Sequence, residues 1–389
     1  MKSLIQQLAA KYQDDCVAIR HHLHAHPELS FEEHETSRFI QEKLKEWGIS
    51  FQVMAGTGVV GWIEGTDPLS RITALRADMD ALPIQEENDV EYRSLKPGVM
   101  HACGHDVHTT CLLGAARILQ ETRDQWRGSV KLIFQPGEEK NPGGASIMIR
   151  EGVLDNPAPQ RIFGMHVHPL LPSGTFSFRG GKVMASADEI YITVKVKGGH
   201  AAAPHLSADS ILIASQIVLS LQQIVSRNNN PLNPTVLSIT SIQGGNTTNV
   251  IPSEVKMMGT LRAMDETWRF KAHQLIKDQV ETIAAALGGK AEVHIDIGYP
   301  FVLNNEDLTE WAKRKAAALM GEEKVEETEL RMGAEDFAFY SHRIPACFFR
   351  LGVGTESINS NVHTPTFNID EQAIQHGVAM MAWLAIAED

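Results

Sequence analysis

The 389-residue chain has few cysteines and no surplus of positive charge. Four scattered cysteines are too few for a disulfide framework, so a reducing compartment is expected. Lys and Arg number 35 against 48 Asp and Glu, a formal net charge of -13, which argues against nucleic acid or an anionic membrane as partner. The chain also lacks a signal-peptide core and any apolar run long enough to span a bilayer. These absences predict a soluble cytoplasmic protein.

The length and the order of apolar segments predict an α/β protein with more than one domain. Buried-type strands alternate with helices, and three strands run into acidic or histidine clusters at residues 77–80, 135–139 and 166–169. In α/β proteins, catalytic and ligand-binding residues usually lie in the loops that follow the carboxyl ends of the strands. The first 48 residues predict two helices broken at His26-Pro27-Glu28, and a helix near the C-terminus closes the domain.

The pattern changes between residues 184 and 297. There the order β-α-β-β-α-β, with alternating apolar and polar strand residues, predicts a ferredoxin-like two-layer module inserted in the chain. The expected layout is therefore a discontinuous catalytic domain, residues 1–183 and 298–389, around an inserted lid, residues 184–297.

Residues 100–108 form the densest cluster of metal-binding side chains. Three histidines, one cysteine and one aspartate fall within nine residues, directly before an apolar run that predicts a helix. Thiolate, imidazole and carboxylate are the ligand set of a zinc-class ion. The stretch alone does not say which of its members bind metal: His101, Cys103, His105, Asp106 and His108.

Glu138 and Glu139 follow a buried-type strand and a Pro-Gly turn. Adjacent carboxylates directed into an interior repel each other unless cations neutralise them. One could ligate metal while the other takes a proton from metal-activated water. An exposed acidic turn is the alternative.

Further histidines lie downstream and upstream of this pair. His166 and His168 flank one residue at a strand end, so both or neither would turn inward, and His363 lies in a polar loop before the last helix. Taken singly, each also fits a packed or solvated histidine. The histidine-rich run 21–26 has no carboxylate or thiol positioned to complete a site, which favours a structural or solvent-facing role.

The predicted insert contributes two glycine-rich loops, residues 198–205 and 244–252. The first presents His200 and His205, the second offers amide side chains, and Arg262 ends the next strand. Neutral donors with one guanidinium can grip a carboxylate and an oxyanion. Ordinary β-turns are the alternative.

Cys103 could instead be a nucleophile, because a thiolate beside His and Asp can carry out acyl transfer. Its distance of two residues from His105 is closer to ligand spacing than to a triad arrangement, so this reading is the weaker one.

The motifs, taken in order, resemble those of the aminoacylase and hippurate-hydrolase-like amidohydrolases. This family is a branch of the co-catalytic zinc metallopeptidases that also includes auxin-conjugate hydrolases and N-acetyldiaminopimelate deacetylase. The resemblance covers nearly the whole chain. Each motif block is weak evidence alone, and the occurrence of all the blocks in this order makes the resemblance specific. The blocks are residues 23–33, 76–83, 100–108, 135–139, 164–166, 198–202, 332–337 and the loop of His363.

The resemblance implies two divalent ions with Cys103 as the bridging ligand. Zinc is the expected metal, and relatives also work with manganese, cobalt or nickel. Glu138 would act as general base and then as acid. The implied ligands are Cys103, His105, Glu139, His166 and His363.

The resemblance also implies roles for residues of the insert. His200 would steady the oxyanion across a dimer interface, while Asn249 and Arg262 would hold the substrate carboxylate. The insert would carry the contacts of a homodimer. At 78–80 the chain departs from the superfamily, because Asp78-Met79-Asp80 replaces His-x-Asp, and Asp80 is then expected to orient a ligand.

The predicted protein is a zinc-exopeptidase-like α/β enzyme with an inserted ferredoxin-like lid. Its predicted reaction is hydrolysis of the amide bond of N-acetyl or N-benzoyl L-amino acids, or of small dipeptides. N-acetyldiaminopimelate deacetylase and small-peptide carboxypeptidase are alternatives. A catalytically silent metal-binding protein and a thiol amidase are alternatives of other classes. The acyl group, the amino acid and the metal stay open.

Overall fold

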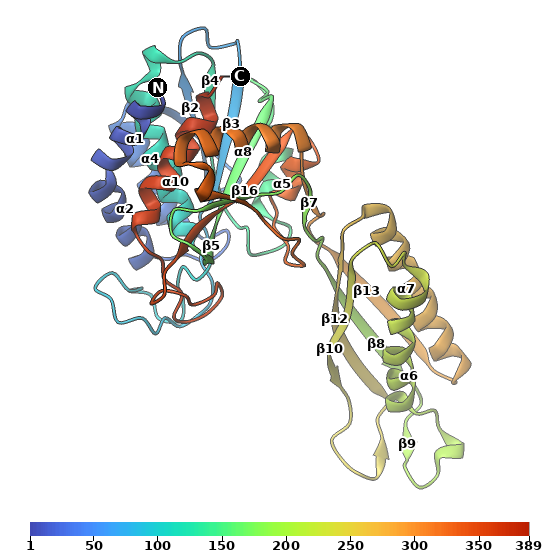
Figure 1. Ribbon diagram of the computed structural model, residues 1–389. Coiled ribbons are helices and arrows are strands. Elements are labelled where there is room, and N and C mark those ends of the chain that lie inside the picture. The colour runs from blue at the N-terminus through green and yellow to red at the C-terminus, as the bar shows by residue number, and fades with distance from the viewer. Residues whose placement is uncertain (389) are drawn as a thin grey trace. The chain divides into compact units, whose positions relative to one another are not determined.

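A computed structural model describes residues 1–388, which form two compact units (Figure 1). Unit 1 consists of Met1–Val183, Val302–Glu329 and the residues from Asp336 onward, and unit 2 of Met184–Phe301 and Leu330–Glu335. Each unit has its own hydrophobic core and is described by itself.

Unit 1 is built on an eight-stranded mixed sheet with the order β1-β2-β4-β3-β5-β16-β6-β15. Strands β4, β3, β5 and β16 are mutually parallel neighbours, whereas β1–β2, β2–β4 and β6–β16 are antiparallel. The predicted mixed α/β sheet flanked by helices is confirmed. The strands are β1 (Ser50–Met54), β2 (Gly58–Glu64), β3 (Ile72–Asp78), β4 (Ser129–Gln135), β5 (Arg161–Pro172), β6 (Phe176–Phe178), β15 (Val325–Glu327) and β16 (Ala346–Gly354), with β7 (Gly181–Met184) pairing with β14 (Val302–Asn304).

The central strands are buried along their whole length because both faces of the sheet are covered. Every residue of β3, β4 and β16 is buried. Helices α4 and α10 lie directly on the sheet, and α1 and α2 pack against them on the same side (Figure 1). The helices are α1 (Lys2–Lys11), α2 (Gln13–Ala25), α3 (His34–Glu46), α4 (His105–Glu121), α5 (Gly144–Arg150), α8 (Glu306–Met320), α9 (Ala338–Ser341) and α10 (Gln372–Ile386).

The N-terminal segment differs from the two helices expected, because the first of them is divided at Tyr12 into α1 and α2. Tyr12 is buried, its hydroxyl donates to Glu121 at 2.5 Å, and the Arg117 guanidinium lies 3.7 Å from the ring centroid. These contacts attach the junction to α4. Local helical periodicity continues across the break and therefore does not reveal it.

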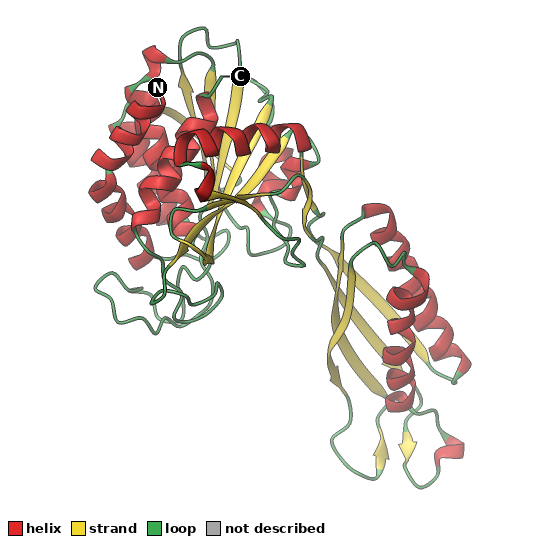
Figure 2. Cartoon of the chain, in the orientation of Figure 1, coloured by secondary structure: helices red, strands yellow, loops and turns green. Residues whose placement is uncertain are grey.

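Unit 2 is a four-stranded antiparallel sheet with two helices on one face (Figure 2). Its sheet order, β10-β12-β8-β13, and its chain order are those of a ferredoxin-like module. Strand β8 alternates buried and exposed residues, as a strand with one covered face does. The elements are β8 (Asp188–Lys195), β9 (Gly199–His200), α6 (Ser210–Gln223), β10 (Thr235–Gln243), β11 (Val250–Ile251), β12 (Glu254–Ala263), α7 (Glu266–Ala286) and β13 (Lys290–Ile297).

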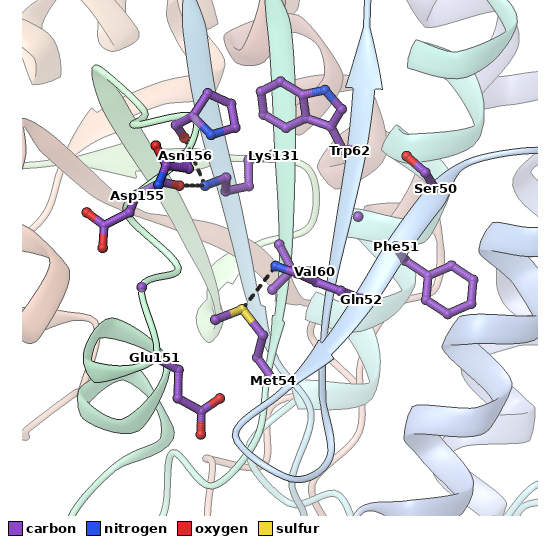
Figure 3. A pocket seen from close by; sticks show the side chains of 13 residues that line it. Ser50, Phe51, Gln52, Met54, Val60, Trp62, Lys131, Glu151, Asp155 and Asn156 are labelled. Atoms are coloured by element: carbon purple, nitrogen blue, oxygen red, sulfur yellow. Dashed lines mark hydrogen bonds between the residues drawn. The ribbon is translucent and has the colours of Figure 1, made fainter.

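A surface hollow of about 610 Å³ lies beside strands β1 and β2 of unit 1 (Figure 3). Lys131 of β4 reaches its wall and donates to the carbonyls of Val153, Asp155 and Pro157 at 2.7, 2.8 and 2.9 Å. All three ammonium hydrogens are thus used to hold the loop after α5. None of the residues predicted for catalysis or metal binding lines this hollow.

Among residues 1–388, no helix combines the length and the apolar composition needed to cross a membrane.

Candidate metal centre

The candidate ligands of unit 1 meet at one edge of the mixed sheet. Asp78 ends β3 and Asp80 follows it, Glu138 and Glu139 follow β4, and His166 lies in the middle of β5, two residues beyond Gly164, which pairs with Arg76 of β3. These strands are parallel neighbours, so their carboxyl ends lie at the same edge. Strand β5 extends to Pro172, beyond the expected end at residue 165, and it buries both His166 and His168.

The 100–108 motif reaches this edge through the start of α4. Gly104 precedes the helix with φ +84°, and a Cβ at this position would lie 2.4 Å from a methyl group of Val167. Only glycine fits this left-handed turn against β5. The helix begins at His105, which places Cys103 and His105 on either side of the turn.

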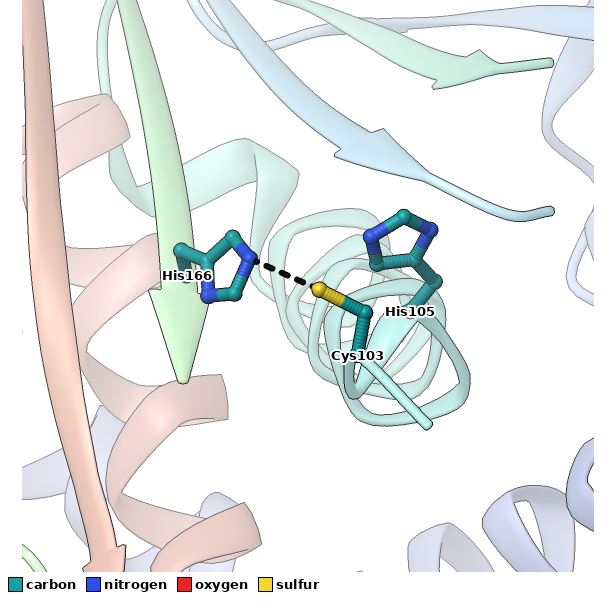
Figure 4. A group of neighbouring side chains, drawn as sticks. All are labelled: Cys103, His105 and His166. Atoms are coloured by element: carbon teal, nitrogen blue, oxygen red, sulfur yellow. Dashed lines mark hydrogen bonds between the residues drawn. The ribbon is translucent and has the colours of Figure 1, made fainter. Parts of the chain in front are cut away.

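Cys103 is the meeting point of two groups of ligand-type atoms (Figure 4 shows the first). Its sulfur lies 3.4 Å from Nε2 of His166 and 3.3 Å from Nε2 of His363. Cys103, His105 and His166 form one group and Cys103, Glu139 and His363 the other, with the ligand atoms of each group within 4.8 Å of one another. The five residues predicted as metal ligands are therefore brought together.

The histidines present their Nε2 atoms to this cluster. His166 donates from Nδ1 to the Val167 carbonyl at 2.8 Å, and Nδ1 of His105 lies 3.2 Å from Oδ1 of Asp80. A proton held at Nδ1 leaves the lone pair of Nε2 for another partner. This is the arrangement that a metal-ligating histidine adopts.

Two buried atoms in the cluster have no hydrogen-bond partner among residues 1–388. They are Nε2 of His105 and Oε1 of Glu139. The second lies 3.2 Å from Nε2 of His363, although without the alignment of a hydrogen bond. Because buried polar atoms nearly always have partners, these two, together with the thiol, imidazole and carboxylate donors, fit divalent cations.

Cys103 also needs a cation if it is to ionise. Burial, followed by the negative charge of Glu139, raises the pKa of its thiol. A divalent ion would oppose both effects, because it favours the thiolate.

Asp80 connects three parts of the centre. Its Oδ2 accepts from the Ser30 hydroxyl at 2.6 Å and from the Glu139 amide at 3.0 Å, while Oδ1 faces His105. Burial alone would raise the pKa of Asp80, but the hydrogen bond from His105 and the His105 charge hold it below its ordinary value. The carboxylate therefore stays ionised beside the imidazole that it orients.

Asp78 and His108 form a close pair beside the ligand cluster, with Oδ2 of Asp78 3.8 Å from Nε2 of His105. Nδ1 of His108 lies 2.5 Å from Asp78, and the Val167 amide donates to Nε2 of His108 at 2.9 Å. Arg76 donates to Asp78 at 2.6 Å and to Asp336 at 2.7 Å. Both nitrogens of His108 are used and Asp78 has a cationic partner in Arg76, so this pair supports the sheet edge.

Glu138 lies beside the predicted ligands in a buried position. Its carboxylate groups with His105 and Glu139 within 4.8 Å, and its Oε1 accepts from the Asp336 amide at 3.4 Å. Only 6% of the residue is exposed. The position suits a group that exchanges a proton with a small molecule held in the cluster.

The histidine-rich run contains one buried histidine, His24. Its Nδ1 and Nε2 lie 2.8 Å from Asp106 and 3.1 Å from Glu86, and Arg20 donates to the same Asp106 at 3.1 Å. His101 is buried nearby, and burial lowers its pKa to about 4. The run thus anchors the first turn of α4, in agreement with the structural role expected for it.

Sequence reasoning did not single out four buried charged residues around the centre. Each of them hydrogen-bonds to a residue at a strand end or at the start of α4. Glu33, Arg76 and Asp336 lie inside the motif blocks. The blocks drew attention to these positions, but no role could be assigned to the three residues from the sequence. The four are Arg20, Glu33, Arg76 and Asp336.

The other predicted site residues belong to unit 2. His200 lies on β9 opposite Val250, and the Asn249 carbonyl accepts from the Ala201 amide at 3.0 Å, so His200 and Asn249 are backbone neighbours. Both side chains are exposed. Arg262 lies on another strand, β12, where it is half-buried, its Nε donates to Thr260, and burial lowers its pKa.

Residues 74–387 match the model of peptidase family M20/M25/M40. The chain is 44% identical to an N-acyl-L-amino acid amidohydrolase of Geobacillus stearothermophilus, over 79% of this chain and 82% of that protein. It is 40% identical to thermostable carboxypeptidase 2 of Saccharolobus solfataricus, over 96% and 95%. A crystal structure from Bacillus subtilis, described as a dinuclear metal binding peptidase of the M20 family, matches with a TM-score of 0.83 and 36% identity, over 97% of this chain and 98% of that one. The chain therefore belongs to peptidase family M20/M25/M40 and is a metal-dependent hydrolase that acts on amides.

Proposed function

We propose that the protein hydrolyses the amide bond of N-acyl-L-amino acids, of the N-acetyl or N-benzoyl type, with small dipeptides as further substrates. The observation that carries the proposal is the pair of ligand groups that share Cys103, with the buried Glu138 carboxylate beside them. A protein that only stored metal would need the ligands and not an additional buried carboxylate.

We propose that Cys103, His105, Glu139, His166 and His363 hold two divalent ions. When bound, such ions would lower the pKa of a water molecule and polarise the amide carbonyl. Glu138 takes the proton from the water and later delivers it to the departing nitrogen. Asp80 keeps the His105 ring oriented throughout.

The roles of the unit 2 residues are proposed on their chemistry. His200 would donate to the oxygen that becomes negative as the amide carbon is attacked. Asn249 and Arg262 would hold the substrate carboxylate, for which an amide and a guanidinium are suitable donors. Every N-acyl amino acid carries a free carboxylate, so the enzyme can bind all substrates of this class through the same group.

Two alternative substrates keep the same reaction. A small-peptide carboxypeptidase also cleaves an amide beside a free carboxylate, and a relative carries that description. N-acetyldiaminopimelate deacetylase differs only in the amino acid. The thiol amidase alternative requires ionised Cys103 as the nucleophile, which the raised pKa of its thiol disfavours.

The metal and the compartment are proposed from side-chain chemistry. A thiolate with imidazoles favours zinc, while manganese, cobalt and nickel also accept histidine and carboxylate. All four cysteines are free and buried, which suits a reducing cytoplasm.

We propose a homodimer that forms through unit 2. Strand β10 is an edge of the four-stranded sheet, and its exposed residues include Val236 and Ile242. Helix α6 packs beside this edge and exposes Leu212 and Leu219, which are 53% and 67% accessible and seven residues apart on one helical face. An open edge next to apolar side chains suits pairing with a second copy about a two-fold axis.

The substrate proposal predicts that a panel of N-acyl amino acids and dipeptides yields free amino acid with the metal-restored protein. The apoprotein should be reloaded with zinc, manganese, cobalt and nickel in turn, and the product measured by amine release. A chelator should abolish turnover. Stoichiometric metal without hydrolysis of any compound would favour the silent metal-binding alternative, and chelator-resistant turnover the thiol amidase.

Glu138→Gln should lower kcat by about 10²–10⁴-fold while the metal content stays the same, because the amide cannot accept the proton from water. Steady-state kinetics and metal analysis on the same preparation measure both quantities. Near-normal turnover of this variant would remove Glu138 from the role of base.

Cys103→Ala should lose both metal ions, whereas His363→Ala should lose one, since Cys103 alone belongs to both three-residue groups. Metal content after dialysis distinguishes the two results. Cys347→Ala is the matched control, because this buried thiol lies in β16 outside the ligand groups and should leave two ions bound. Two retained ions in Cys103→Ala would contradict the shared-ligand arrangement.

The double substitution Leu212→Asp with Leu219→Asp should convert the protein to a monomer, as charges there would have to be buried on association. Light scattering coupled to size exclusion measures the mass. Leu69→Asp is the control, because this leucine is 77% exposed in unit 1. A dimer that survives the double substitution would place the interface elsewhere.

A further inference from the structure

The segment before α3, residues 28–33, contacts the metal centre at two points, and the mechanism above assigns it no role. Its backbone is joined to the end of β3, because the Ala81 amide donates to the Glu28 carbonyl at 2.7 Å and Leu29 bridges to Ala81. From this anchorage Ser30 reaches Asp80 and Glu33 reaches the turn after β4. The segment therefore braces two separate strand ends.

The Glu33 side chain is fully buried and accepts three hydrogen bonds. Its Oε1 accepts from the amides of Phe31 and Gly137 at 2.9 and 2.8 Å, and its Oε2 accepts from the Thr57 hydroxyl at 2.7 Å. A buried carboxylate is costly to retain, and here it joins its own segment, the turn after β4 and the residue before β2 through hydrogen bonds.

The amide of Gly137 matters because the next residue is Glu138. Glu33 holds the N–H of Gly137, and the Gly144 amide donates to the Gly137 carbonyl at 3.0 Å. The peptide planes on both sides of the Gly137 α-carbon are therefore fixed. They determine the direction in which the chain enters Glu138.

The conformation of this turn is available only with outside support. Gly137 has φ +57°, and a Cβ there would lie 2.4 Å from the Phe31 ring, so the ring packs directly on the turn. Phe31 itself has φ +67°, a left-handed conformation unfavourable for a bulky residue. Such strain persists only where the surroundings impose it, and it clusters at functional sites.

We propose that Glu33 is a positioning residue that aims the Glu138 carboxylate by holding the Gly137 amide. The inference rests on the proposed function, because it takes Glu138 as the base. It predicts that loss of Glu33 acts on the chemical step and not on substrate binding or metal binding.

Glu33→Ala, studied on folded and metal-loaded protein, should lower kcat by about 10–100-fold with KM and metal content close to the parent, since a base misplaced by about 1 Å loses rate of this order. Glu33→Gln should recover kcat to within about threefold of the parent. Its amide oxygen can accept from both backbone amides, and its NH₂ can donate to Thr57. Burial and the Asp80 charge raise the pKa of Glu33 to about 7, so the neutral side chain is a close substitute.

Glu28→Ala is the matched control, because Glu28 also accepts from two backbone amides, those of Glu35 and Thr36, but these belong to the first turn of α3. It should lower the melting temperature and leave kcat unchanged. If Glu33→Ala gives no folded protein, Thr57→Val frees only Oε2 and should lower kcat alone by about two- to fivefold.

An unchanged kcat in Glu33→Ala, or in Thr57→Val where that variant stands in for it, would overturn the inference. So would equal losses in Glu33→Ala and Glu33→Gln, or a loss of kcat that only follows a loss of metal. Glu138→Gln separates this failure from that of the proposed function. If Glu138→Gln is inactive while Glu33→Ala is fully active, only the role of Glu33 is wrong.

Discussion

The Asp80 carboxylate is the interaction on which the metal centre depends. It lies beyond the end of β3, and its two oxygens meet the Ser30 hydroxyl, the Glu139 amide and the His105 ring. These partners belong to the segment before α3, the turn after β4 and the start of α4. Asp80, one buried and ionised group, thereby fixes the predicted ligands His105 and Glu139 and the segment 28–33 relative to one another. A neutral side chain at this position could not satisfy the same donors in the interior.

Unit 1 buries many charged side chains around the metal centre, and each must be stabilised by a partner. Arg76 forms ion pairs with both Asp78 and Asp336, and Arg20 pairs with Asp106, so these buried carboxylates have cationic partners within the chain. At the ligand cluster, buried polar atoms outnumber their hydrogen-bond partners, as Nε2 of His105 and Oε1 of Glu139 show. The imbalance is local, and it is what a family of metal-dependent hydrolases requires.

Much of the fold and of the ligand set could be predicted because both leave local signals. Apolar runs such as 130–134 predict central strands, and alternation such as that of 190–196 predicts a half-covered sheet. Chemistry-bearing residues directly after such strands, Glu138 and Glu139 among them, are then expected at one sheet edge. Tyr12 was missed because the break between α1 and α2 depends on Glu121 and Arg117, which are far away in sequence. The extension of β5 through His168 was missed because it depends on pairing with β16.

The sequence by itself determined the residue types, their order and the strand ends that carry them, and these are sufficient for the family and the chemistry. Only the tertiary structure decided which ligand-type residues act together. His108 has the same side chain as His105 and lies one helical turn away, yet its nitrogens are taken by Asp78 and Val167. Glu33 lies more than a hundred residues from Gly137 and has no local signal that relates it to that turn. The physical reason is that a buried polar atom is assigned by its nearest partners in space, and periodicity along the chain does not record them.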